Sequence, residues 1–270
     1  MPCPSWVTDS STALDVTAVL VAIATLLSAA ELLALRAEFS SHGLFDARVL
    51  TSTRPGFLAG RFTSVSTPRI AGAQLVLAVM VIVFLTLDVS PALPLVGLAV
   101  ATILQRVLIP YGRDGSDELG RVLTITVAIA FVFAGDTYVA RIALGFIAAQ
   151  LCLSYVASGL AKIFGRPWRT GTAVPGILHT AFGHPGIARS ALDRCPTAGK
   201  GLTWLVVSFE LAIPVGVVLG GWAGVVALAG AAAFHVGIAV FMGLNRFVPW
   251  FFAAFPAAAW AACQYGLLSR

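Results

Sequence analysis

The amino-acid sequence predicts an all-α protein, a polytopic helical bundle in which about eight helices cross a membrane. Of its 270 residues, 59% are hydrophobic and only 11% are charged, whereas about 25% are charged in an ordinary soluble domain. The mean hydropathy is +0.93, and several apolar runs approach the roughly 20 residues that cross a bilayer as a helix. These observations exclude a soluble globular enzyme and predict a single transmembrane domain over residues 1–270.

Eight apolar segments are candidates for the spanning helices. In chain order they cover residues 16–35, 70–87, 91–109, 119–134, 142–161, 202–219, 222–242 and 247–267. The third segment contains Gln105 and Arg106 and the fourth is short, so we expect these two helices to be tilted, kinked or partly interfacial. The connection 88–90 and the pair Gly220 and Gly221 are short and predict antiparallel hairpins.

Two connections are long and polar. Residues 36–69 and 162–201 are rich in Gly, Pro, Ser and Thr. Long connections of this kind often carry function. We expect surface structure or substrate contacts in both.

The distribution of positive charge predicts the orientation. The net charge is +5, and in a membrane protein a basic excess indicates topology first, so no nucleic acid partner is expected. With Met1 outside, only Arg141 and Arg270 of the 17 Lys and Arg residues lie on the outer side. This bias predicts that both chain termini are extracytoplasmic.

The cysteines and histidines give no sign of a disulfide or a metal site. Cys3, Cys152, Cys195 and Cys263 form no C-x-x-C pair and no metal-ligand spacing. The loop histidines His179 and His184 are five residues apart, a poor helical spacing for sharing one metal ion. We therefore expect neither a disulfide framework nor a bound metal.

Three ionisable residues in apolar segments are candidates for function, because charged groups are costly inside a bilayer. Glu210 lies near the middle of the sixth segment, four residues before Pro214, and it either lines a pathway or bonds to a neighbouring helix. His235, in the inner half of the seventh segment, is either a packing residue or part of a pocket. Lys162 ends the fifth segment, where a lysine commonly anchors a helix at the headgroups. If its amine turned into an apolar pocket, it would lose its proton more readily and could serve as a base.

Two segments of the chain resemble a known family. The first segment has one helix face with Tyr155, Ser158, Gly159 and Lys162, and Trp168 and Gly171 follow it. The second segment begins with Phe234 and His235, which are followed by Phe241, Gly243, Phe247, Pro249 and Trp250. This pattern resembles the vitamin K-dependent gamma-carboxylase and its bacterial relatives with the horizontally transferred transmembrane domain. The turn at 112–121, which contains Asp117, is similar to a Gly and Asp turn of the bacterial members, so the part most typical of the family is 112–250.

The resemblance implies a membrane-embedded oxygenase or epoxidase of a bacterial inner membrane. In the family, the lysine that matches Lys162 deprotonates a hydroquinone, which reacts with molecular oxygen without a metal ion and leaves as an epoxide. The expected catalytic residues are therefore Lys162 and His235, and the co-substrates are oxygen and a reduced, quinone-like lipid. The expected substrate-binding residues are Tyr155, Glu210, Trp168, Phe247, Trp250 and Asp117. The chain lacks the large extracytoplasmic region of the animal enzyme, so carboxylation of a protein substrate is not expected.

Two other functions fit the sequence. One is an accessory maturation factor for a secreted peptide, as some bacterial relatives are. The other is a small transporter, which would need broken helices near the middle of the membrane. Only Glu210 beside Pro214 suggests such a break. We place the oxygenase first and the transporter last.

Overall fold

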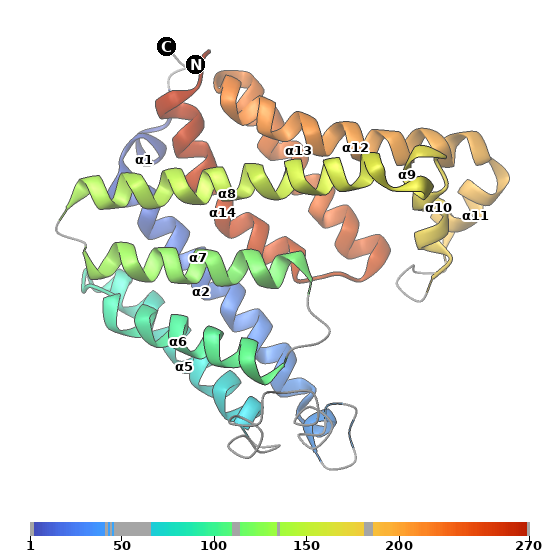
Figure 1. Ribbon diagram of the computed structural model, residues 1–270. Helices are drawn as coiled ribbons and strands as arrows, with labels where there is room; N and C mark the ends of the chain where they lie inside the picture. Colours follow the sequence, from blue (N-terminus) through green and yellow to red (C-terminus); the bar gives the residue numbers. More distant parts are fainter. Residues whose placement is uncertain are drawn as a thin grey trace. The chain divides into compact units, whose positions relative to one another are not determined.

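The structure is a computed structural model that describes residues 3–40, 43, 45, 66–109, 114–133, 136–180 and 186–268. All regular elements in these residues are helices, and no strand occurs among them (Figure 1). The predicted fold class, a polytopic all-α membrane bundle, is therefore confirmed.

Each of the eight predicted segments contains a helix. Six helices are long and apolar enough to cross a membrane: α2 (Ser10–Ala34), α5 (Ser66–Thr86), α8 (Thr137–Phe164), α12 (Pro196–Leu219), α13 (Gly221–Met242) and α14 (Phe247–Tyr265). The other two are α6 (Ala92–Leu108), with 17 residues, and α7 (Gly115–Val132), whose first two turns contain the charged residues Asp117, Glu118 and Arg121. These are the third and fourth segments, which the sequence already marked as the weakest. The count of eight spanning helices stays a prediction.

The chain divides into two compact units, and the first comprises residues 14–143. In it, α5 packs against α6 and α6 against α7, and the short 3-10 helix η1 (Arg36–Phe39) follows α2. Glu118 pairs with Arg106 of α6 at 3.4 Å and with Arg121 of its own helix. Both arginines of these apolar segments thus share one carboxylate partner.

The second unit comprises residues 1–13 and 144–270. It contains most of α8, the helices α12, α13 and α14, and four short helices: α1 (Ser5–Thr8), α9 (Arg166–Arg169), α10 (Ala173–Leu178) and α11 (Ile187–Arg194). Helices α12, α13 and α14 pack against one another, and α1 packs on α14.

Glycines set the hairpin between α12 and α13, as the sequence predicts. Gly220 and Gly221 have φ values of 67° and 53°, a region that favours glycine. A Cβ atom on Gly216 would lie 2.5 Å from the Cβ of Ala227 and 2.9 Å from the carbonyl oxygen of Ala223. Glycine at 216 therefore allows the two helices to approach closely.

The expectation that the chain has no disulfide is wrong. Cys3 and Cys263 form a disulfide with a Cα–Cα distance of 6.1 Å, although they are 260 positions apart. Cys3 lies two residues before the start of α1, and the packing of α1 on α14 brings it to Cys263. Cys152 and Cys195 are free.

Candidate functional site

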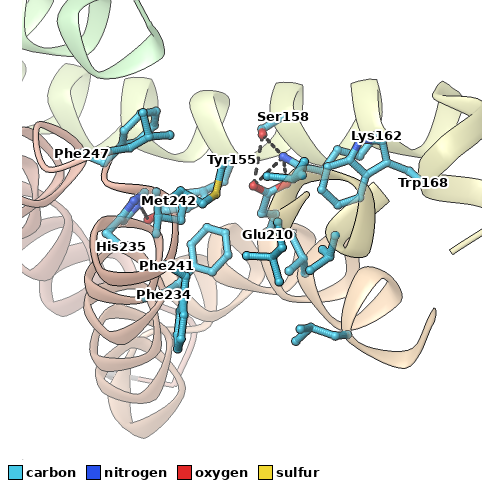
Figure 2. A pocket seen from close by; sticks show the side chains of 18 of the residues that line it. Tyr155, Ser158, Lys162, Trp168, Glu210, Phe234, His235, Phe241, Met242 and Phe247 are labelled. Atoms are coloured by element: carbon cyan, nitrogen blue, oxygen red, sulfur yellow. Dashed lines mark hydrogen bonds and ion pairs between the residues drawn. The ribbon is translucent and has the colours of Figure 1, made fainter. Parts of the chain in front are cut away.

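The second unit contains a partly open cavity of about 610 Å³. Ligand pockets in proteins usually measure about 300–1,000 Å³, so this volume suits a small molecule. The walls come from α8 to α14 and are mostly apolar, with Phe234, Phe247 and Phe251 among the aromatic residues that line them. Figure 2 shows the cavity with its polar side chains.

A buried ion pair forms one polar part of the wall. The Nζ atom of Lys162 lies 2.8 and 2.7 Å from the two carboxylate oxygens of Glu210 and 2.5 Å from Oγ of Ser158. The Ser158 hydroxyl in turn donates to Oε1 of Glu210 at 3.1 Å. The side chains of Lys162 and Glu210 are 17% and 5% exposed. Nζ also lies 5.1 Å from the centre of the Trp168 ring, within the range of a cation–π contact.

A second polar pair lies further along the same face of α8. The hydroxyl of Tyr155 and Nε2 of His235 are 2.7 Å apart, and His235 is only 2% exposed. The imidazole ring lies between aromatic neighbours, with its centre 3.8 Å from that of Phe251 and 5.9 Å from that of Phe247. Among the described residues, Nδ1 of His235 has no hydrogen-bond partner. Buried polar atoms usually have one, and this nitrogen is an exception among the described side chains.

The local sequence explains why these side chains meet. Tyr155, Ser158 and Lys162 are three and four residues apart, so the pitch of α8 places them on one face, as predicted. A Cβ atom on Gly159 would lie 2.7 Å from Cδ2 of Leu211. The missing side chain lets α12 approach α8 and brings Glu210 within reach of Lys162.

The connection between α8 and α12 closes one side of the cavity. Leu178 of α10 and Leu192 of α11 line it, and for the residues that follow them, Nε2 of His179 lies 3.0 Å from Oδ1 of Asp193. The buried hydroxyl of Thr203 bonds to the carbonyl oxygens of Gly171 and Gly199 at 3.2 and 2.9 Å and accepts from the backbone N–H of Val174 at 3.3 Å. Surface structure or substrate contacts were predicted for this connection; its described residues contribute to the cavity wall, and contact with a substrate stays a prediction.

Most of the predicted site residues line this one cavity: Lys162, His235, Tyr155, Glu210, Trp168 and Phe247. Trp250 is buried in α14 but is not among the lining residues. Asp117 belongs to the other unit, where it completes the capping box at the start of α7 with Asp114. The roles assigned to these residues stay predictions.

Sequence reasoning missed Ser158 as a member of the site and the contributions of α10 and α11. The signal for Ser158 was present, since it shares a helix face with Lys162 at a spacing of four. Apart from Trp168, nothing in the sequence indicated which residues of the long connection would line the cavity.

Comparison of the chain with models of protein families, with curated proteins and with solved structures gave no match. In the part of the chain that the structure describes, no group of three or more His, Cys, Asp or Glu side chains is arranged to hold a metal ion. The function of the protein is therefore inferred from the geometry of the cavity and from the sequence resemblance.

Proposed function

We propose that this protein is a membrane-embedded oxygenase that converts a hydroquinone-like lipid to its epoxide without a metal ion, with Lys162 as the general base. The observation that carries the proposal is the Lys162–Glu210 pair in the wall of an apolar, ligand-sized cavity. The order of residues from Tyr155 to Trp250, which resembles the carboxylase family, agrees with it.

The cavity suits a flat apolar molecule with polar groups. Such a molecule partitions into the bilayer and reaches membrane helices directly, and aromatic walls stack well on a ring. Apolar walls also limit the access of water to reactive oxygen intermediates.

Lys162 needs Glu210 in order to act as a base. An ammonium group has three donors and no acceptor, and Nζ of Lys162 donates to Ser158 and to both oxygens of Glu210. The amine becomes available when one proton moves from Lys162 to Glu210. The free amine can then take the proton of a ligand hydroxyl.

The overall reaction balances with oxygen as the only oxidant. One hydroquinone and one dioxygen give one quinone epoxide and one water. One oxygen atom enters the ring, and the other leaves as water with the two hydroxyl hydrogens of the hydroquinone. Dioxygen accepts four electrons, two from oxidation of the hydroquinone to the quinone and two from the ring double bond that becomes the epoxide.

The direct test is incubation of the purified protein with reduced naphthoquinones and isotopically labelled oxygen gas. Mass analysis should find one labelled oxygen atom in the epoxide. Absence of any epoxide or oxygen consumption across a panel of reduced quinones would contradict the oxygenase and favour the accessory role for a secreted peptide.

Replacing Lys162 tests the base. Lys162→Ala should insert and bind ligand yet lose turnover by a factor on the order of a hundred or more, the usual contribution of a positioned base. Lys162→Arg should fail as well, because a guanidinium stays protonated although it keeps the positive charge. Lys200→Arg, at an exposed position of α12, is the matched control and should stay active. Full activity of Lys162→Arg would mean that the amine serves only as a charged anchor.

We also propose that the protein lies in a bacterial cytoplasmic membrane with both termini outside. The bias of Lys and Arg residues supports this orientation. The Cys3–Cys263 disulfide supports it independently, because disulfides persist on the oxidising side of that membrane. Phe247 lies sixteen residues before Cys263 in α14, roughly 24 Å along the helix axis, so the cavity would lie towards the cytoplasmic side.

A further inference from the structure

We propose that Glu210 is the group that holds the proton removed from the ligand, while Lys162 stays charged beside the ligand oxyanion. The inference rests on one part of the proposed function, namely that the ligand presents an acidic ring hydroxyl. It does not depend on any later reaction with oxygen.

A count of protons leads to this assignment. In the ion-paired arrangement Lys162 already carries three N–H bonds and Glu210 carries none. When a ligand hydroxyl gives up its proton, the O–H bond of the ligand breaks and one new bond to hydrogen forms within the pair. If Lys162 first passes a proton to Glu210 and then takes the ligand proton, the final state is an ammonium, a protonated Glu210 and a ligand oxyanion. Direct transfer to Glu210 ends in the same state.

The hydrogen bonds of Glu210 leave room for that proton. Oε1 accepts from both Lys162 and Ser158, whereas Oε2 accepts only from Lys162 among the described residues. Each carboxylate oxygen has two lone pairs, so Oε2 has one to spare. With the proton on Oε2, the hydroxyl of Ser158 still donates to Oε1, and the N–H that now contacts Oε2 at 2.7 Å can turn to the ligand oxyanion.

Electrostatics favours the same outcome. Before the transfer the ammonium is balanced by the Glu210 carboxylate, and afterwards it is balanced by the ligand oxyanion. The net charge of the site does not change, which matters because an unpaired ion is costly in a buried site. A lysine without the carboxylate would either be a buried, unpaired cation or lose its proton to solvent before the ligand arrives. The carboxylate thus keeps both the charge and the proton within the cavity.

The test uses naphthol, an aromatic hydroxyl compound that cannot form a quinone epoxide by the proposed reaction. Naphthol is mixed with the purified wild-type protein at a pH at which free naphthol is neutral, and three signals are followed. Ultraviolet absorption reports whether bound naphthol is ionised, a pH indicator reports protons released to the medium, and infrared difference spectra report a new carboxylic acid C=O band. The proposal expects bound naphtholate, no proton release and a new acid band.

Other results in the wild-type protein contradict the proposal. Binding as neutral naphthol would show that the pair takes no proton, and naphtholate with one proton released would show that the proton leaves the protein. Failure of naphthol to bind would show that the cavity does not accept a ring hydroxyl at Glu210. None of these results requires a variant that might fold poorly.

Variants then assign the acid band. Glu210→Gln should lose the acid band, because the naphthol proton can then go only to Lys162 or to the medium, while Glu118→Gln, a control at the ion pair of α7, should keep it. Retention of the acid band in Glu210→Gln would overturn the assignment. If Lys162→Arg still forms naphtholate with an acid band, Glu210 takes the proton directly and only the role of Lys162 as base is wrong. If naphthol ionises but no reduced quinone is epoxidised, the oxygenase fails and the role of Glu210 stands.

Discussion

At the scale of single residues, the site holds two charged side chains, Lys162 and Glu210, inside an apolar bundle. An isolated Lys or Glu near the middle of a bilayer costs about 3 kcal/mol or more, and Lys162 and Glu210 avoid this cost by pairing at 2.7 Å. The pair is also completed by the Ser158 hydroxyl, which bonds to both groups. Replacing one partner leaves the other without its counter-charge, so a variant of the pair that still inserts is expected to be less stable as well as less active.

The hydrogen bond between Tyr155 and His235 gives a prediction about stability. Tyr155→Phe removes the hydroxyl and leaves Nε2 of His235 buried without its partner at 2.7 Å. Leaving a buried polar group unsatisfied costs about 1–3 kcal/mol, so the variant should unfold at a lower temperature in detergent. Tyr138→Phe is the matched control, because Tyr138 is 67% exposed, and its unfolding temperature should not change. Equal unfolding temperatures for the two variants would show that the Tyr155–His235 bond contributes nothing.

The residue pattern on α8 could be predicted from the sequence, but the pairing across helices could not. Helical spacing placed Tyr155, Ser158 and Lys162 on one face, and the structure confirms that they line one cavity. Glu210 was expected either to line a pathway or to bond to another helix, and the structure shows that it bonds to Lys162 of α8 in the wall of the cavity. The pairing of Glu210 with Lys162 depends on how closely α12 approaches α8. The missing side chain of Gly159 allows this approach beside Leu211, and such a contact between helices cannot be read from residue spacing.

At the scale of helices, apolar length was a sufficient guide to where the long helices lie. All eight predicted segments contain a helix, and the two that the sequence marked as weak are the two that fall short of a clear membrane-spanning helix. The short helices α9, α10 and α11 were not predicted. They have only four to eight residues, too few for a periodic pattern, and their form depends on packing over the cavity.

The contact between α12 and α13 gives a prediction at this scale. In Gly216→Ala the new methyl group would lie 2.5 Å from the Cβ of Ala227, so the helices must separate. Overpacking of this kind costs about 1–3 kcal/mol, and thermal unfolding should occur at a lower temperature. Gly145→Ala in α8 is the control, since no atom lies within 4 Å of its added Cβ. If the two variants unfold at the same temperature, the close approach of α12 to α13 does not contribute to stability.

At the scale of the whole chain, the Cys3–Cys263 disulfide is the feature that could not be predicted from the sequence. Cys3 and Cys263 are separated by 260 positions, and no spacing rule connects cysteines so far apart. Their meeting depends on α1 folding back on the end of α14. In the chain-entropy description, a cross-link that closes so long a loop restricts the unfolded chain strongly.

The disulfide also allows the orientation of the protein to be tested. In a variant with Cys152→Ala and Cys195→Ala, only Cys3 and Cys263 remain, and neither has a free thiol. If both termini face outward, a membrane-impermeant maleimide should not label intact spheroplasts. It should label both cysteines after treatment with a membrane-impermeant reductant.

A variant that also carries Cys3→Ala supplies the control for this experiment. Its Cys263 thiol has no partner and should be labelled in intact spheroplasts without reduction, which shows that the reagent reaches this end of α14. Labelling that appears only after the membrane is broken would place Cys263 on the cytoplasmic side. The orientation inferred from the Lys and Arg residues would then be reversed, and the cavity would lie towards the outer side of the membrane. Labelling of the two-cysteine variant without any reductant would instead show that the Cys3–Cys263 bond does not form, and the independent support that it gives to the orientation would be lost.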